Sequence, residues 1–282
     1  MQTFDNDQLH YIAKGKVHQD ILRNEINDAL NDNAFNDNYI ISSLPGLGKT
    51  YETMTAIKSL ETQPLIIEGS SGIFAFVLDI TTAAFIAGGK RQVVILDDCD
   101  VIFEDKNLNI AKKMFDGTRK LVYGKSANSL RALCSELQWE AVQHFKTDER
   151  AGFQVPLDNF TFITLTNREL ATINEVENAK PGSKAHSRQV DLHAIRRRTK
   201  VKHINMEQEE LWGYVANVVL NEHICENFKP KISIAEKEQI LSWCFANWAS
   251  VTERNLSLIE KMTKDMVKYP TSYLNIWKSE YL

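Results

Sequence analysis

The chain alternates short, almost wholly apolar runs with longer segments whose apolar residues recur every three or four positions. The short runs are typical of buried strands, and they predict strands at 38–43, 64–67, 92–96, 160–166 and 200–206. Helical spacing follows them, most clearly from Ile73 to about Ala87, where Gly88 and Gly89 end the segment. Strands separated by helices predict an α/β fold with a parallel sheet and helices on both faces.

The regions flanking these strands have a different pattern. Residues 1–37 form a polar segment with a weak apolar stripe, which predicts one or two helices: Leu9, Ile12, Val17, Ile21, Ile26 and Leu30. Residues 38–206 are predicted to be the core domain, and the mixed composition of 118–157 suggests an insertion in it.

Residues 207–282 carry only helical patterns and predict a small all-helical lid domain. Ser233–Glu236 and Ser250–Glu253 match capping boxes that would begin two helices, and Pro270 would end the last one.

The first predicted strand leads into Ser-Leu-Pro-Gly-Leu-Gly-Lys-Thr at 43–50, which matches a phosphate-binding P-loop. Glycines let backbone N–H groups surround phosphate oxygens, and the following helix N-terminus adds positive potential. Lys49 would reach the β- and γ-phosphates of ATP, and the Thr50 hydroxyl would bind Mg²⁺. Ser43 stands where the pattern has glycine, and it fits if its φ is negative. The remaining predicted nucleotide contacts are Pro45, Gly46, Leu47, Gly48 and Tyr51.

Carboxylates follow the third predicted strand, Val93–Leu96. Asp97 would hold the hydration shell of Mg²⁺, and Asp98 would orient and polarise the attacking water. Asp100 adds a third acid. Asn167, at the end of the fourth predicted strand, could contact the γ-phosphate or the water, although asparagine at a strand end also commonly forms a turn.

The order of these motifs resembles the AAA+ ATPase superfamily over roughly residues 38–265. The resemblance implies that Asn167 is sensor 1, that Arg198 or equally Arg197 is the arginine finger, and that Arg254 is sensor 2. It also implies a ring or spiral homo-oligomer with ATP at its interfaces. The Leu-Asp-Asp-Cys-Asp run and the segment from Leu108 are similar to AAA+ proteins of tailed bacteriophages and, more distantly, to clamp loaders and helicase loaders. The family usually has Asp-Glu where this chain has Asp97-Asp98, and the shorter side chain would disfavour fast hydrolysis.

The distribution of charged residues along the chain suggests what kind of partner the protein binds. The formal net charge is −4, but residues 106–131 carry seven bases against Asp116 alone, and 180–202 carry eight against Asp191 alone. A DNA-handling ATPase, acting in replication or recombination, would use the first stretch to contact phosphates, through Lys112, Lys113, Arg119, Lys120 and Lys125. The run Arg196–Arg198 could itself be a solvated or nucleic-acid-facing surface.

Two alternatives to a nucleic-acid remodeller stay open. A polypeptide-threading ATPase would use Ile73 and Phe74 as an apolar pore loop, although both could be ordinary core residues. An ATP-gated binding switch with little turnover would fit the short Asp98 side chain.

The remaining sequence features concern metal and disulfide sites, membrane spans and location in the cell. The four cysteines form no C-x-x-C pair, so we expect neither a zinc site nor a disulfide framework. No apolar run approaches the roughly 20 residues that span a bilayer. The first seven residues have no basic region and no apolar core, so we expect no secretory signal. A cytoplasmic location is expected, in the host cytoplasm if the protein is viral.

Overall fold

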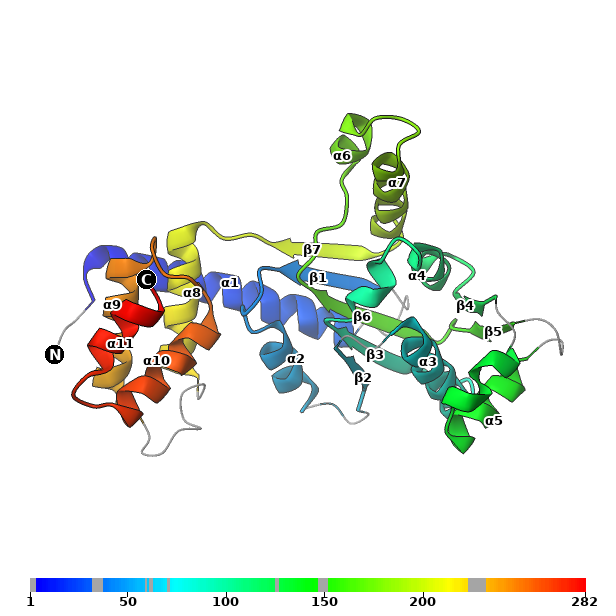
Figure 1. Cartoon of the computed structure of the whole chain (residues 1–282), viewed down its shortest axis with the longest axis horizontal. Coiled ribbons are helices and arrows are strands. Elements are labelled where there is room, and N and C mark those ends of the chain that lie inside the picture. The colour runs from blue at the N-terminus through cyan, green and yellow to red at the C-terminus, as the bar shows by residue number, and fades with distance from the viewer. Residues whose placement is uncertain are drawn as a thin grey trace. The chain divides into compact units, whose positions relative to one another are not determined.

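A five-stranded sheet is the centre of the α/β fold, with strand order β2-β3-β6-β1-β7 (Figure 1). In the computed structural model the described residues are 4–31, 38–58, 60, 63–69, 72–124, 127–146, 152–222 and 232–282. The pairs β2–β3, β3–β6 and β6–β1 are parallel. The strands are β1 (Tyr39–Ser43), β2 (Leu65–Glu68), β3 (Gln92–Asp97), β6 (Phe160–Thr166) and β7 (Lys200–Ile204).

The middle of this sheet is buried on both faces. All residues of β1 and β6 are buried, which is why their sequences read as continuous apolar runs with only small polar residues between them. The predicted strands are therefore confirmed, with β7 ending two residues before Met206.

Helices follow most strands. The first helix, α1 (Asn6–Asn31), precedes the sheet. The helices between β1 and β7 are α2 (Lys49–Ile57), α3 (Ile73–Ala87), α4 (Leu108–Phe115), α5 (Glu136–Phe145), α6 (Ile173–Asn178) and α7 (Lys184–Arg196). The C-terminal ones are α8 (Gln208–Asn221), α9 (Ile234–Asn247), α10 (Leu256–Lys268) and α11 (Tyr273–Glu280). The α3 helix has the predicted bounds and ends at Gly88, whose φ of 55° is left-handed.

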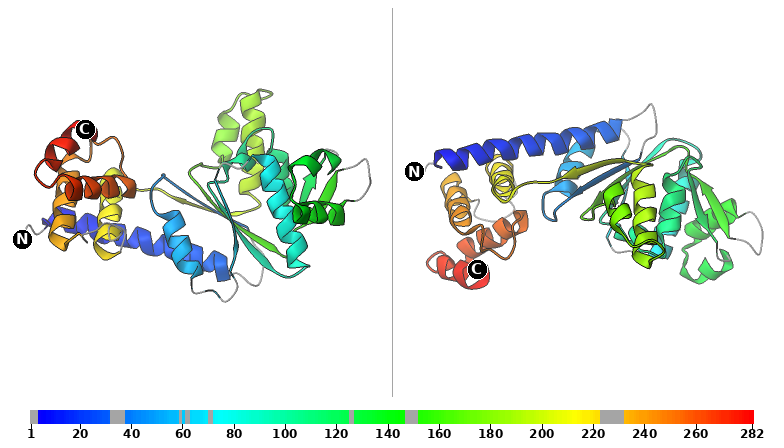
Figure 2. Two further views of the ribbon diagram at one scale, coloured as in Figure 1. Left: turned by 60° about the horizontal axis from the view of Figure 1, so that its bottom comes forward. Right: turned by 90° about the horizontal axis from the view of Figure 1, so that it is seen from above.

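The first predicted segment forms a single helix, α1, which Figure 2 shows as continuous. Its predicted stripe is only partly correct, because Leu9 and Val17 are exposed whereas Ile26 and Leu30 are buried. The end of this predicted segment, residues 32–37, lies outside the described residues.

Two expectations for the C-terminal region need correction. Ser233 does begin α9 with a capping box, but the second box at Ser250 is wrong, since α10 starts at Leu256 with Asn255 as its N-cap. Ser250 instead lies in the closing turn of α9, where its N–H donates to Asn247 O at 2.8 Å. Beyond Pro270 the chain forms one more helix, α11.

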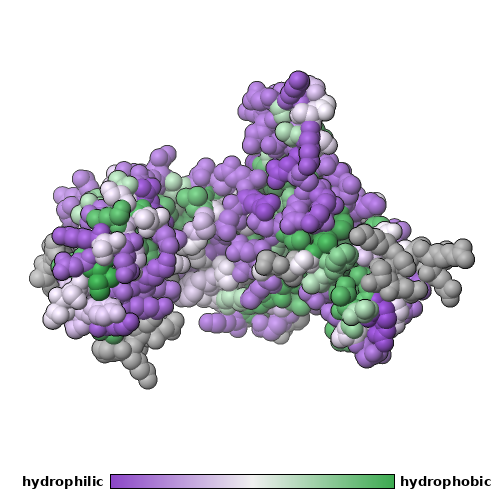
Figure 3. Space-filling view, in the orientation of Figure 1, coloured by the Kyte–Doolittle hydropathy of each residue, from purple (hydrophilic) through white to green (hydrophobic). Residues whose placement is uncertain are grey.

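The helices α6 and α7 were not predicted; α7 lies within the second basic stretch, and α6 comes directly before it. Figure 3 shows that the surface of this helix pair is mainly hydrophilic, so no apolar stripe marked it. The expected insertion at 118–157 contains an antiparallel hairpin of β4 (Lys120–Tyr123) and β5 (Phe153–Pro156), with the 3₁₀ helix Ala127–Leu133 and α5 between its strands.

The chain divides into two compact units. Unit 1 comprises Met1–Ile26, Leu44–Thr53 and Ile204–Leu282, and unit 2 comprises Asn27–Ser43 and Met54–His203. The linear division expected from the sequence, at 37 and 206, stays a prediction.

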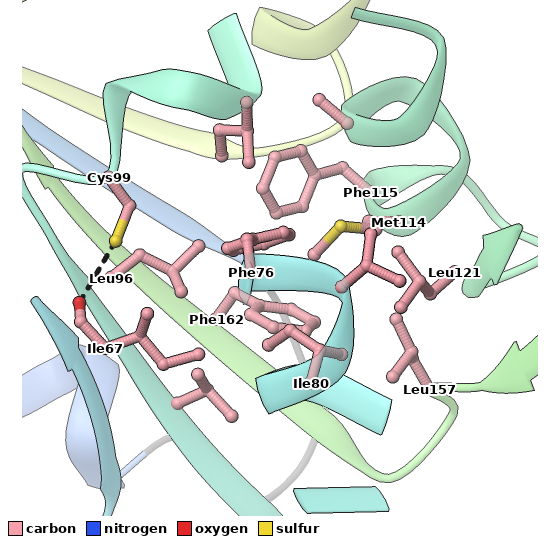
Figure 4. Close-up of a cluster of buried hydrophobic side chains, with 14 of the residues drawn as sticks. Ile67, Phe76, Ile80, Leu96, Cys99, Met114, Phe115, Leu121, Leu157 and Phe162 are labelled. Atoms are coloured by element: carbon pink, nitrogen blue, oxygen red, sulfur yellow. Dashed lines mark hydrogen bonds between the residues drawn. The ribbon is translucent and has the colours of Figure 1, made fainter. Parts of the chain in front are cut away.

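Each unit has its own apolar core. In unit 2, β-strand residues pack against α3 and α4, and Figure 4 shows Phe76 and Phe115 beside Phe162. In unit 1, the helices α8 to α11 enclose Trp212 and Trp277. The helices α1 and α8 approach so closely that a Cβ at Gly15 would lie 2.3 Å from the Gly213 backbone.

Candidate active site

The loop after β1 has the backbone that a phosphate-binding loop needs. Gly46 and Gly48 have φ values of 76° and 73°, which side chains rarely adopt, and α2 begins directly afterwards at Lys49. Ser43 is not among the residues with positive φ, so serine is tolerated there as expected. Thr50 is exposed on the first turn of α2, whereas the side chain of Lys49 is buried and its ammonium donates to Leu44 O at 3.4 Å.

Two helices of unit 1, α8 and α10, donate hydrogen bonds to backbone carbonyls of this loop. The Tyr214 hydroxyl of α8 donates to Leu47 O at 2.5 Å, and the N–H of Leu256 in α10 donates to Gly46 O at 3.3 Å. Leu47 is buried in the unit 1 core. A Cβ at Gly46 would lie 2.4 Å from the Cβ of Asn255, so the close packing requires glycine as much as the φ does. The loop conformation is therefore fixed by α8 and α10.

A buried polar network fixes the first turn of α2. The Glu52 carboxylate is almost fully buried and accepts from Gln19 Nε2 and Arg23 Nε of α1, both at 2.6 Å. Arg23 also pairs with Glu222 at the end of α8, and the Tyr51 hydroxyl donates to the same carboxylate at 3.3 Å. The hydrogen bond that Arg23 donates to Glu52 is the main reason that the pKa of Arg23 is raised. The network ties α1, α2 and α8 together one turn beyond Lys49.

A cavity of about 510 Å³ opens beside the start of the loop within unit 1. Its lining is Leu44, Pro45, Leu211, Val251, Thr252, Glu253, Arg254 and Asn255. Arg254 lies before α10, not inside a capped helix as the sequence suggested. Its guanidinium donates to the α9-terminal carbonyls of Trp248 and Ala249 at 2.7 and 2.6 Å. A direct nucleotide contact by Arg254 stays a prediction.

In unit 2 the carboxyl ends of β3 and β6 bring the predicted polar residues together. The strands pair Asp97 with Leu165, and the Asn167 amide donates to Asp98 Oδ1 at 3.2 Å. Asp97 is buried, whereas Asp98 and Asn167 are exposed. Asp98 has a φ of 51°, a left-handed conformation that Asp adopts more readily than most residues. This backbone favours aspartate at the position where the resembled family has glutamate.

The residues around this pair were not predicted as a set. Asp100 accepts from the Thr166 hydroxyl and from Arg168 Nε, each at 2.7 Å. A cavity of about 290 Å³ within unit 2 is lined by Gly72, Ile73, Asp98, Asp100, Val101, Glu104, Lys106 and Arg168. The only sequence signal for Arg168 was its place directly after Asn167.

Cys99 lies between these acids but takes no part in polar chemistry. Burial, with the nearby carboxylates of Asp97 and Asp100 adding to it, raises the pKa of the Cys99 thiol to about 12. The thiol therefore stays protonated and donates to Ile67 O at 3.1 Å, the dashed line in Figure 4.

The three consecutive arginines end α7 in different surroundings. Arg196 donates to Leu170 O at 3.0 Å and is half-buried, whereas Arg197 and Arg198 are exposed. Arg198 donates to Ala194 O at 3.2 Å within its own turn. Exposure suits either of the last two for contact with another molecule.

The basic stretch after the acidic residues is partly used inside the fold. Lys112 pairs with Asp191 at 2.7 Å, and the guanidinium of Arg119 donates to Phe160 O at 2.8 Å. Lys113 and Lys120 are exposed, and Lys125 lies outside the described residues. Within the part of the chain that the structure describes, no helix is long and apolar enough to cross a membrane.

Comparison with known proteins adds a likeness of fold only. No protein-family model matches the sequence, and no curated protein matches it. The chain is similar to a solved structure, the closed-state cryo-EM reconstruction of Hsp104 with ATPγS and FITC casein. The alignment has 12% identity and a TM-score of 0.44, and it covers 86% of this chain but 41% of the Hsp104 chain. A likeness at this level carries no argument about activity, so the following proposal rests on the residues themselves.

Proposed function

We propose that the chain is a Mg²⁺-dependent ATPase of the AAA+ type that binds ATP through the loop 43–50 and hydrolyses it with Asp98. The observation that carries the proposal is the loop itself. Two glycines with positive φ connect a buried parallel strand to a helix that begins at a Lys-Thr pair. Backbone N–H groups and a helix N-terminus arranged in this way bind phosphate, and Lys49 supplies the matching charge.

The donors expected for Mg²⁺ are present. This ion prefers oxygen ligands and is commonly held by one or two side chains together with substrate phosphates. The exposed hydroxyl of Thr50 and the carboxylate of Asp97 are donors of that kind. When bound, the ion would neutralise charge on the phosphate oxygens.

Asp98 and Asn167 supply the hydrolytic step in this proposal. The Asp98 carboxylate accepts a hydrogen bond from water and orients its oxygen toward the γ-phosphorus. The new P–O bond forms as the bond from the γ-phosphorus to the bridging oxygen breaks. ADP leaves with that electron pair, and the proton of the attacking water passes to the Asp98 carboxylate. Asn167, which donates to Asp98 at 3.2 Å, keeps the carboxylate oriented for this step.

Assembly into a ring or spiral is part of the proposal. Arg197 and Arg198 are exposed at the end of α7 and have long side chains that could complete the site of a neighbouring copy. A guanidinium supplied in this way stabilises charge that develops on the transferred phosphoryl group.

For the partner, nucleic acid is our first candidate. Lys113 and Lys120 are exposed and could contact phosphates without sequence preference. The internal contacts of Lys112 and Arg119 make this surface smaller than the sequence suggested. A polypeptide is the second candidate, favoured by Phe74, which is 38% exposed at the first turn of α3.

The ATPase proposal is tested by Lys49→Ala. Removal of the charge nearest the phosphates should abolish ATP binding, measured by titration calorimetry in the presence of Mg²⁺. Lys90→Ala, at an exposed lysine in the loop before β3, is the matched control and should bind ATP as the wild type does. Equal ATP affinity in the Lys49→Ala and Lys90→Ala variants would show that the loop is not a nucleotide site.

The partner is tested with ATP-bound protein and duplex DNA at increasing salt. Each neutralised phosphate contributes about 0.9 to the slope of log affinity against log salt, so replacing Lys113 and Lys120 by Ala should flatten it by about two units. No DNA binding at low salt would instead favour the polypeptide. In that case Phe74→Ala should lose ATP-driven unfolding of a model substrate while it keeps ATP hydrolysis.

A further inference from the structure

Asp100 is bonded to both neighbours of Asn167. Its Oδ1 accepts from the hydroxyl of Thr166 at 2.7 Å, and its Oδ2 accepts from Arg168 Nε at 2.7 Å. The Thr166 hydroxyl accepts in turn from the backbone N–H of Arg168 at 3.1 Å. One carboxylate therefore closes a ring of hydrogen bonds around the residue that contacts Asp98.

The backbone on the other side of the pair is held from the same place. The N–H of Asp100 donates to Asp98 O at 2.9 Å, and the N–H of Asp98 donates to Leu165 O at 3.1 Å. These bonds fix Asp98 in its left-handed conformation, with φ of 51°. The end of β3 and the end of β6 are thus joined through Asp100 on both sides of the Asp98–Asn167 contact.

Apolar packing does not perform this task. Asn167 and Asp98 are both exposed, so neither side chain is enclosed by the apolar core. Thr166, by contrast, is fully buried, and a buried hydroxyl needs a hydrogen-bond acceptor. Asp100 supplies that acceptor and at the same time pairs with Arg168, whose side chain is 42% exposed.

We propose that Asp100 is a positioning residue for hydrolysis, which holds Asn167 so that its amide meets the Asp98 carboxylate. Both oxygens of Asp100 accept from donors that flank Asn167, so we assign the group to positioning rather than to activation of water. The inference rests on the proposed ATPase function and goes further by explaining what orients the water-activating pair.

The test is Asp100→Asn, which keeps the size of the side chain but turns an amide toward Arg168 or Thr166. We expect kcat for ATP to fall by a factor of about 10 to 10² while the Kd for ATP stays the same, because misplacement of a reacting group by about 1 Å has that effect. The matched control is Asp105→Asn. Asp105 pairs with Arg188 at 2.7 Å at a similarly exposed position but touches neither strand end. Its loss should leave kcat unchanged.

A double-mutant cycle separates positioning from a merely structural role. In an Asn167→Ala background, Asp100→Asn should lower kcat by less than about twofold, because the group that it positions is already gone. A full additional loss in that background, or equal kcat in Asp100→Asn and wild type, would overturn the inference.

A measurement without turnover keeps this inference separate from the ATPase proposal. Hydrogen–deuterium exchange of the peptide that contains Asn167 and Arg168 should be faster in Asp100→Asn than in Asp105→Asn. Unchanged exchange overturns the positioning role even if the protein hydrolyses ATP. If no hydrolysis that depends on Lys49 is found, the ATPase proposal fails, whatever the exchange shows.

Discussion

The loop at 44–53 and the strand ends at Asp98 and Asn167 are held by opposite kinds of contact. The loop is fixed by buried groups of unit 1: Leu47 lies in an apolar core and Glu52 in a closed polar network. At the strand ends, the contact between Asp98 and Asn167 is a hydrogen bond between exposed side chains of unit 2. The first arrangement contributes to folding as well as to binding, whereas the second contributes little to stability.

This difference between the two regions predicts which variants lose stability and which lose catalytic rate. A buried charge that loses its partner is strongly destabilising, whereas an exposed polar contact contributes about 1 kcal/mol or less. Substitutions around the loop should therefore be seen first in thermal unfolding. Substitutions at the strand ends should be seen only in the rate of hydrolysis.

The largest effect is expected at Asp98. Asp98→Asn keeps a residue that tolerates a positive φ but removes the charge that polarises water, so ATP turnover should fall by a factor of about 10² to 10⁴. Steady-state ATPase assays measure the loss, and thermal unfolding should show no change. An unchanged rate would show that Asp98 takes no part in ATP hydrolysis.

Asp98→Glu is the matched control, because it keeps the charge and changes the backbone preference. Glutamate tolerates the left-handed φ of 51° less well than aspartate, at a cost of about 1 kcal/mol. We expect a small loss of stability and no gain in turnover from the longer side chain. Faster hydrolysis in this variant would show that reach, not backbone conformation, limits the reaction.

The next effect is expected at Arg23, on the loop side. Arg23→Met leaves the buried carboxylate of Glu52 with Gln19 as its remaining partner in the ion-pair network, and should destabilise unit 1 by about 3 kcal/mol. Urea denaturation measures the change. Lys16→Met on the same helix breaks an exposed pair with Asp20, and should cost no more than about 0.5 kcal/mol. Equal losses of unfolding free energy in the two variants would show that the ion pair with the buried Glu52 stabilises the protein no more than the exposed Lys16–Asp20 pair does.

The fold was largely predictable because buried strands and α3 carry their pattern in local sequence. The exceptions have physical causes. The helices α6 and α7 are polar and mostly exposed, so no apolar period marks them. The false capping box at Ser250 had the correct residue types, but its first N–H groups were already bonded to Asn247 of the preceding helix. Local patterns cannot report a competing partner of that kind.

The site was predictable as far as it depends on strand ends. Parallel strands finish at one edge of a sheet, which is why Asp98 and Asn167 could both be assigned to strand ends from the sequence. The hydrogen bond between them was not predicted. The role of Asp100 depends on two residues more than 60 positions away, and the burial of Glu52 depends on α1. An acid in the first turn of a helix is usually exposed, so nothing in the sequence marked Glu52 as buried.

The smallest effect is expected at the N-cap of α9, a helix of unit 1. Ser233 accepts from the N–H of Glu236, and Glu236 accepts from Ser233, so Ser233→Ala should cost about 1 kcal/mol of stability. The backbone hydrogen bond from Ser233 is the main reason that the pKa of Glu236 lies below its ordinary value of 4.5. A folded-state pKa below the unfolded one stabilises the protein above pH 4.5, and that contribution disappears as the pH falls through the folded value. Ser233→Ala keeps this backbone N–H but removes the hydroxyl that also donates to Glu236 Oε2 at 2.7 Å and so lowers the same pKa. The difference in unfolding free energy between wild type and Ser233→Ala should therefore be larger at pH 7 than at pH 3.5, by urea denaturation. A difference that does not change with pH would assign the stabilisation to the bond that the hydroxyl accepts from Glu236 N–H. A cost comparable to that of Arg23→Met would show that caps stabilise this unit as strongly as its buried network.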